Sequence, residues 1–141
     1  MAPPVSRIDV IVHFANGGRL TPEDFALIEA IRVHRSIIGA GRATGVSYRK
    51  CWLMVDALNR TFEAPVFATY PGRKETGSEL TPFGERLVAL YKSMERRARS
   101  GAAAAMAELE GALNPDYRPR ASGGALEAPK SAPRRRQSPR S

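Results

Sequence analysis

The sequence is poor in the residues that build disulfides and metal sites. Its 141 residues include a single cysteine, Cys51, and only two histidines. One thiol cannot form a disulfide within the chain or a multi-thiolate metal site, and such low cysteine usage is typical of a reducing compartment. His13 and His34 do not stand at ligand spacing from Cys51, so we expect neither a metal site nor a cofactor.

Long apolar runs are also missing. Hydrophobic residues make up 43% of the chain and charged residues 26%, both close to globular averages. No run approaches the roughly 18 apolar residues that a membrane span requires. No basic patch followed by an apolar stretch stands near Met1, so no secretory signal is visible. The sequence therefore predicts a cytoplasmic protein of about one domain, without a membrane span.

Acidic residues are fewer than basic ones. The chain has 22 Lys and Arg against 14 Asp and Glu, a net charge of +8, which favours nucleic acid or an anionic membrane as partner. Residues 114–141 hold seven of the basic side chains, two of the acidic ones and five of the eleven prolines. We expect them to form a disordered basic tail. Residues 1–113, the predicted folded domain, are only mildly basic.

The first elements follow from alternation and capping residues. Alternating β-branched residues predict a strand at about residues 6–14, closed by a turn at residues 16–18. Thr21 before Pro22 is typical of a helix N-terminus, and this helix is expected to run through about Arg35. Mixed strands and helices indicate an α+β fold.

The next stretch predicts two helices joined by a tight turn. Ser36 is suited to cap a helix that ends at Gly45, because glycine adopts the left-handed conformation readily. Ser47 is suited to cap a further helix, on which Cys51, Val55, Leu58 and Phe62 share one apolar stripe. A helix, a tight glycine-containing turn and an amphipathic second helix form a helix-turn-helix.

A wing and a long helix are expected to follow. Residues 66–70 and 78–80 read as two strands around the polar loop 71–77, and Thr81 with Pro82 again signals a helix start. The apolar stripe of this helix continues to Leu113 and exceeds what a small domain can cover, so a partner helix is expected to bury it in a homodimer. The predicted dimerisation residues are Leu87, Tyr91, Met94, Met106, Leu109 and Leu113.

The basic residues of these elements point to double-stranded DNA. A helix-turn-helix reaches base edges in the major groove with the first residues of its second helix, where Arg49 and Lys50 stand. Hydroxyl groups and further cations around them are expected to contact phosphates. The predicted DNA-binding residues are Ser36, Arg42, Ser47, Tyr48, Arg49, Lys50 and, at the wing tip, Arg73 and Lys74.

No arrangement of catalytic residues stands out. The glycines of residues 39–45 resemble a phosphate loop, but the third glycine comes one position late and no strand precedes them. Cys51 falls on an apolar stripe, where a thiolate is disfavoured. We therefore predict that the chain is not an enzyme.

Four motifs stand out along the chain. They are Ser36-Ile37, the run Ala43-Thr44-Gly45-Val46-Ser47-Tyr48-Arg49-Lys50-Cys51-Trp52, then Val55-Asp56-Ala57-Leu58-Asn59, and finally Leu80-Thr81-Pro82-Phe83-Gly84. Together they closely resemble the N-terminal winged helix-turn-helix domain of ModE-type molybdenum-responsive transcription regulators, over about residues 6–113. LysR-type regulators show the same frame more distantly.

The resemblance implies a dimeric regulator that binds operator DNA, with Ser47 to Lys50 on the recognition helix. Gly41 and Cys51 depart from the family, which usually carries alanine or another small apolar residue there. Full-length members carry C-terminal molybdate-binding domains, whereas this chain ends in a basic tail, so the resemblance assigns no molybdate or other oxyanion site to any residue here.

Two other functions remain open. A sequence-tolerant architectural DNA binder would use the same fold and depend on the basic tail. A protein-interaction adaptor would use the winged helix as a scaffold and present Trp52, Leu53 and Met54 as an exposed patch. The Arg49–Lys50 pair and the charged wing favour DNA over the adaptor.

Overall fold

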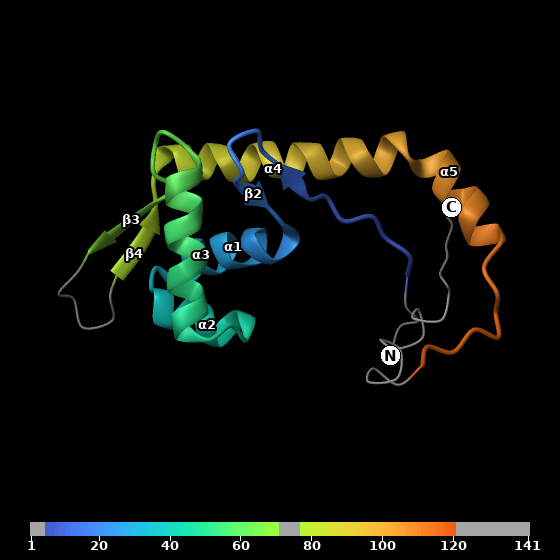
Figure 1. The fold of residues 1–141 in the computed structure, drawn as a ribbon, viewed down its shortest axis with the longest axis horizontal. Coiled ribbons are helices and arrows are strands. Elements are labelled where there is room, and N and C mark those ends of the chain that lie inside the picture. The colour runs from blue at the N-terminus through green and yellow to red at the C-terminus, as the bar shows by residue number, and fades with distance from the viewer. Residues whose placement is uncertain (1–4, 71–76, 121–141) are drawn as a thin grey trace, which may run out of the picture. The chain divides into compact units, whose positions relative to one another are not determined.

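The computed structural model describes residues 5–70 and 77–120, and its fold is α+β as expected. In chain order the elements of these residues are β1 (Val12–His13), β2 (Arg19–Leu20), α1 (Pro22–His34), α2 (Ile37–Thr44), α3 (Tyr48–Thr61), β3 (Phe67–Tyr70), β4 (Gly77–Leu80), α4 (Pro82–Gly101) and α5 (Ala103–Gly111). In Figure 1 the β3–β4 hairpin projects to the left of α3. No helix within the described ranges is both long and apolar enough to cross a membrane.

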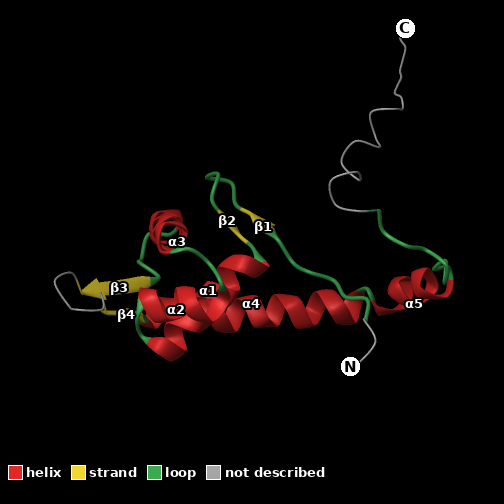
Figure 2. Cartoon of the chain, turned by 90° about the horizontal axis from the view of Figure 1, so that it is seen from below, coloured by secondary structure: helices red, strands yellow, loops and turns green. Residues whose placement is uncertain are grey.

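The N-terminal strand is much shorter than predicted. Instead of residues 6–14 it comprises only Val12–His13, paired antiparallel with Arg19–Leu20. The prediction was wrong because a strand extends only as far as it finds a partner, and β2 ends where Thr21 caps α1. Figure 2 shows β1–β2 as a small hairpin apart from β3–β4.

All four predicted helix caps are confirmed. Thr21 forms a capping box with Asp24, and the side chains of Ser36, Ser47 and Thr81 each accept a hydrogen bond from a backbone N–H in the first turn of α2, α3 and α4. These local contacts fix where each helix begins. They thereby set the short spacing between α2 and α3.

A single core joins the N-terminal hairpin, the first four helices and the β3–β4 hairpin. It includes the predicted stripe of Cys51, Val55 and Leu58, whereas Phe62 at the end of the stripe is only partly buried. The other buried apolar residues are Leu20, Leu27, Ile28, Ile31, Ile37, Ala40, Val66, Phe67, Leu87, Val88 and Tyr91. Burying this stripe fixes which face of α3 points outward.

The β3–β4 hairpin is anchored to α3 by one side chain. Asn59 Oδ1 accepts hydrogen bonds from the backbone N–H groups of Val66 (2.8 Å) and Phe67 (2.9 Å). The strands pair antiparallel from Phe67 with Leu80 to Tyr70 with Gly77. The predicted strand pair is confirmed, and its connecting residues 71–76 lie outside the described ranges.

The long C-terminal helix is interrupted. It was expected to continue from Pro82 toward Leu113, but α4 ends at Gly101 and Ala102 leaves the helical conformation (φ −99°, ψ 3°) before α5 begins. Ser and Gly pairs are common sites of helix breaks, and Ser100-Gly101 stands at this point. The chain divides into two compact units, Met1–Met106 and Ala107–Ser141.

Candidate nucleic-acid interface

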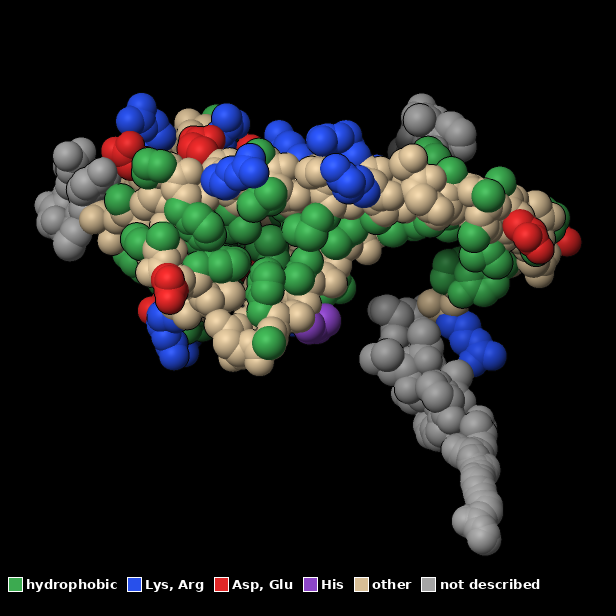
Figure 3. Space-filling model, turned by 90° about the horizontal axis from the view of Figure 1, so that it is seen from above, with side chains coloured by type: hydrophobic (Ala, Val, Ile, Leu, Met, Phe, Trp, Pro, Cys, Tyr) green, Lys and Arg blue, Asp and Glu red, His purple; other side chains and the backbone are tan. Residues whose placement is uncertain are grey.

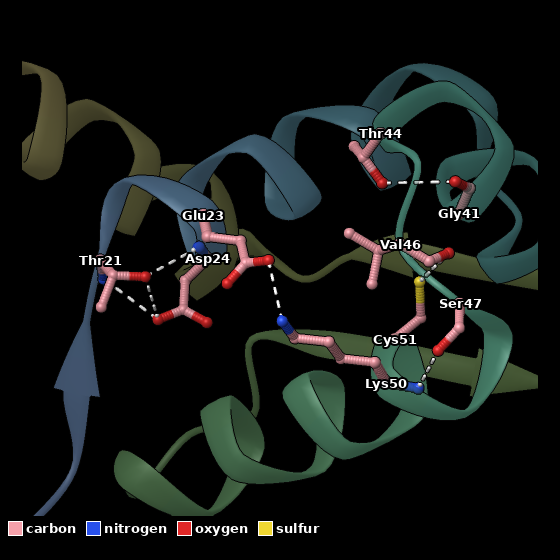
Figure 4. Close-up of polar contacts among 9 residues, drawn as sticks. All are labelled: Thr21, Glu23, Asp24, Gly41, Thr44, Val46, Ser47, Lys50 and Cys51. Atoms are coloured by element: carbon pink, nitrogen blue, oxygen red, sulfur yellow. Dashed lines mark hydrogen bonds and ion pairs between the residues drawn. The ribbon is translucent and has the colours of Figure 1, made fainter. Parts of the chain in front are cut away.

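The turn between α2 and α3 has the geometry of a helix-turn-helix. Gly45 adopts the left-handed conformation (φ 75°), and the backbone N–H groups of Gly45 and Val46 donate to the carbonyl of Gly41 at 2.9 and 3.2 Å. Ser47 then caps α3, its Oγ accepting a hydrogen bond from the N–H of Lys50 at 3.1 Å. Only residues 45–47 separate the two helices, so α3 begins directly beside the end of α2 (Figure 4).

The first turn of α3 is exposed and cationic. Tyr48, Arg49 and Lys50 occupy its first positions, and all three are exposed. The ring of Tyr48 lies edge-on to that of Trp52, with centroids 6.3 Å apart. Burial of the opposite face, at Cys51 and Val55, leaves these residues on the outer side of the fold. The predicted recognition residues are thus brought together at one end of α3.

Arg42 lies near this cationic turn. It is exposed on the last turn of α2, and Arg42, Tyr48 and Val46 line the same surface hollow. Arg42 is therefore positioned to act with the start of α3. Arg73 and Lys74, the two predicted wing contacts, lie outside the described residues.

Ser36 occupies a different environment from the one expected. Its side chain is only 6% exposed, and its Oγ accepts the hydrogen bond from the N–H of Gly39 that caps α2, at 2.9 Å. A hydroxyl buried to this degree offers little surface to a phosphate, whereas Ser47, which caps α3 in the same way, is exposed. We therefore remove Ser36 from the expected DNA contacts.

Sequence reasoning did not identify an acidic neighbour of the recognition helix. Glu23, in the first turn of α1, accepts a hydrogen bond from Lys50, with 3.1 Å between Oε2 and Nζ (Figure 4). The two residues are 27 positions apart, and no local pattern connects them. One of the predicted DNA-binding cations therefore has a carboxylate partner in the free protein.

The predicted dimerisation residues divide into two groups. Leu87 and Tyr91 are 5% and 0% exposed, because the core of their own chain buries them. They have no free surface for a partner helix, which corrects the prediction that they lie in a dimer interface. Met94, Leu109 and Leu113 are exposed, and Met106 is partly exposed. Leu90, which the apolar stripe placed on the inward face of this helix, is also exposed, and it stands one helical turn before Met94.

Apolar surface continues beside α4. The rings of Phe14, Phe62 and Phe83 form a chain of contacts, with centroid separations of 5.4 and 5.2 Å, and all three are only partly buried. Phe62 follows the last residue of α3, so these rings lie at the opposite end of that helix from its cationic first turn. Figure 3 shows one face of the molecule on which hydrophobic side chains gather next to a row of Lys and Arg side chains.

No protein-family model matches the chain. Several curated proteins are similar to it, among them a MopB and a ModE protein. The molybdenum-pterin-binding protein MopB of Rhodobacter capsulatus is 40% identical over 107 residues, which cover 75% of this chain and 38% of MopB. The transcriptional regulator ModE of Haemophilus influenzae is 32% identical over 78 residues, or 55% of this chain and 31% of ModE.

The resemblance to ModE-type proteins is confirmed. The homologues of this chain are ModE- and MopB-type proteins, and the chain spans less than two fifths of each relative. Neither name is that of an enzyme, in agreement with the prediction of no enzymatic activity. Among solved structures, the transcription regulator MepR of Staphylococcus aureus has a TM-score of 0.47 and 14% identity, covering 79% of this chain and 76% of MepR.

Proposed function

We propose that this chain is a transcription regulator of the ModE type that binds operator DNA as a homodimer. The observation that carries the proposal is the exposed cationic first turn of α3, where Arg49 and Lys50 stand at the tip of a helix-turn-helix. Helices of this kind enter the major groove with their N-terminal residues toward the base edges. The ModE-type relatives favour the same function.

Each proposed DNA contact has a chemical role. Arg49 is the proposed base-reading residue, because a guanidinium pairs bidentately with guanine. Arg42, Ser47 and Tyr48 are proposed to bind phosphates, which fixes the register of the helix on the duplex. The wing residues Arg73 and Lys74 remain proposed contacts on the sequence pattern alone.

Dimerisation is proposed to use exposed apolar side chains of α4 and, separately, of α5. Leu90 and Met94 on α4 are 41% and 36% exposed, and Leu109 on α5 is 62% exposed. A second copy that covers these side chains would remove them from water, a favourable change for apolar surface. The dimer predicts two symmetric half-sites about 34 Å apart, one helical turn of DNA.

A link to molybdenum metabolism is part of the proposal and comes from the relatives' names. It concerns the genes that the chain would control. We assign no molybdate site to any residue that the structure describes. A regulator of this kind would act in the cytoplasm.

The test is selection of bound fragments from random and genomic DNA by the purified full chain. We expect enrichment of one two-fold symmetric sequence whose binding survives an excess of bulk DNA at physiological salt. The absence of binding to any duplex at low salt, with the fold intact, would overturn the proposal.

The architectural alternative makes a different prediction in the same experiment. A sequence-tolerant binder would show no enriched motif, and bulk DNA would compete fully. The adaptor alternative needs an apolar patch on α3, but Trp52 and Met54 are half-buried and only Leu53 is well exposed, at 56%. The cationic turn therefore favours DNA as the partner.

A further inference from the structure

We propose that Glu23 is a specificity-determining residue that acts by holding Lys50 away from DNA phosphates. This inference rests on the proposed function and concerns a residue outside the expected DNA contacts. The observation behind it is the ion pair between Lys50 Nζ and Glu23 Oε2, 3.1 Å apart, which links the first turn of α1 to the first turn of α3 (Figure 4).

The capping box of α1 fixes the backbone from which Glu23 projects. Thr21 and Asp24 form the capping box of this helix, in which the N–H and Oγ1 of Thr21 both donate to Asp24 Oδ2 at 3.0 Å. Asp24 is thereby occupied, and the acid that Lys50 contacts is Glu23. A carboxylate in the first turn of a helix is also favoured by the helix dipole, so Glu23 is a stable partner for a cation.

The dipole of α3 acts on Lys50 in the opposite sense to the dipole of α1 on Glu23. A cation near a helix N-terminus is disfavoured by the dipole, and Lys50 stands in the first turn of α3. Glu23 offsets this cost in the free protein. Both side chains are about half exposed, 55% for Lys50 and 52% for Glu23, so the pair is weak enough for DNA to break.

The pair sets what Lys50 contributes to binding. Sequence-independent affinity comes from cations that neutralise phosphates and release counterions. While Glu23 holds Lys50, a phosphate must compete with a carboxylate for the same ammonium group, so random DNA gains little from this lysine. Arg49, next to it, has no such restraint among the contacts of the described residues. Recognition by α3 then depends more on base contacts than on charge.

The test measures the binding of random-sequence duplex DNA over a range of salt concentrations. For Glu23→Gln, which frees Lys50, we expect about threefold tighter binding at low salt and a slope of log Kobs against log[salt] steeper by about 0.9, the signature of one more phosphate contact. Affinity for the selected operator should rise less, so the ratio of specific to non-specific affinity should fall.

A matched control separates this effect from net charge. Glu85→Gln removes the same charge and breaks an equally exposed ion pair, Arg32 with Glu85 at 2.9 Å, which joins α1 to α4 without involving α3. We expect Glu85→Gln to leave the salt slope unchanged. The double variant Glu23→Gln with Lys50→Met should behave as Lys50→Met alone, because the effect of Glu23 passes through Lys50.

Equal slopes for Glu23→Gln and Glu85→Gln, with the wild-type chain binding DNA, would overturn this inference and leave the proposed function standing. A gain in Glu23→Gln that persists in the double variant would also overturn it, because the carboxylate would then act on phosphates directly. A wild-type chain that binds no duplex would overturn the proposed function together with the inference.

Discussion

Cys51 fills the space that a side chain at position 41 would need. A Cβ placed on Gly41 would lie 3.3 Å from Cys51 Sγ and 2.9 Å from the carbonyl oxygen of Val46. Gly41 therefore leaves room for the Cys51 side chain and the Val46 carbonyl where α2 packs on α3.

This contact predicts the effect of Gly41→Ala. We expect the variant to lower the free energy of unfolding by about 1–3 kcal/mol, because overpacking outweighs the better helix propensity of alanine. Adding Cys51→Ala should recover part of the loss, since Sγ is gone while the Val46 carbonyl remains. Urea unfolding of both single variants and the double variant gives the interaction free energy between positions 41 and 51. Strict additivity would show that the two sites are independent.

Cys51 also predicts a pH dependence of stability. Burial raises the pKa of the Cys51 thiol above its ordinary value. The unfolded chain ionises this thiol at lower pH than the folded chain does. The stability it contributes is therefore complete below the unfolded pKa, about 8.5, and is lost as the pH rises through the folded value.

We therefore expect the free energy of unfolding to fall more steeply above about pH 8 for the wild type than for Cys51→Ala, which has no thiol to ionise. Urea unfolding at a series of pH values under reducing conditions makes the comparison. Parallel curves for the two proteins would contradict the prediction.

The helix starts and the wing strands could be predicted from sequence because their signals are local. Thr21, Ser36, Ser47 and Thr81 each act within three residues of their own position. The length of β1 could not be predicted in the same way. It depends on how much chain is left for β2 before Thr21 caps α1.

Contacts between residues far apart in the sequence explain the other differences between the predicted and the observed structure. Helical periodicity shows that Leu87 and Tyr91 are apolar and share a face, but not whether their own chain or a second copy covers them. Tyr91 is covered by its own chain, where its hydroxyl donates to the carbonyl of Val10 at 2.6 Å and its ring packs on Phe25. The pair of Glu23 and Lys50 likewise has no signal in the sequence.

Base reading by α3 is tested with Arg49→Ala. We expect a loss of about 1–3 kcal/mol on the selected operator and a smaller loss on random DNA, if Arg49 pairs with a base. Arg60→Ala is the matched control, because Arg60 is an exposed arginine at the other end of α3, paired with Asp56 at 3.0 Å. Equal losses on both DNAs would restrict Arg49 to phosphate contact.

The proposed dimer contacts are tested with a charge on α4 and, in a second variant, on α5. Leu90→Asp and Leu109→Asp should each shift the protein toward monomer in sedimentation, because an interface would have to bury an unpaired carboxylate. Val33→Asp provides the control, since Val33 is an exposed valine (69%) at the end of α1. If neither leucine variant changes the sedimentation coefficient, the interface lies elsewhere.

The junction of α4 with the wing depends on the absence of a side chain at position 84. A Cβ on Gly84 would collide with the carbonyl oxygen of Val66 and lie 3.1 Å from Leu80 Cδ2. That carbonyl also accepts a hydrogen bond from the N–H of Thr81 at 3.0 Å, so it cannot move away without disturbing the start of α4. A side chain at position 84 would therefore push α4 away from Val66, the residue directly before β3.

We expect Gly84→Ala to destabilise the fold by about 1–3 kcal/mol in spite of the helix preference of alanine. Gly101→Ala is the matched control in the same helix, because nothing lies within 4 Å of a Cβ there, and it should be neutral or mildly stabilising. Thermal unfolding of the two variants separates local crowding from helix propensity. A loss of stability in Gly101→Ala as large as that in Gly84→Ala would place the cause in the helix itself, not in its contact with Val66.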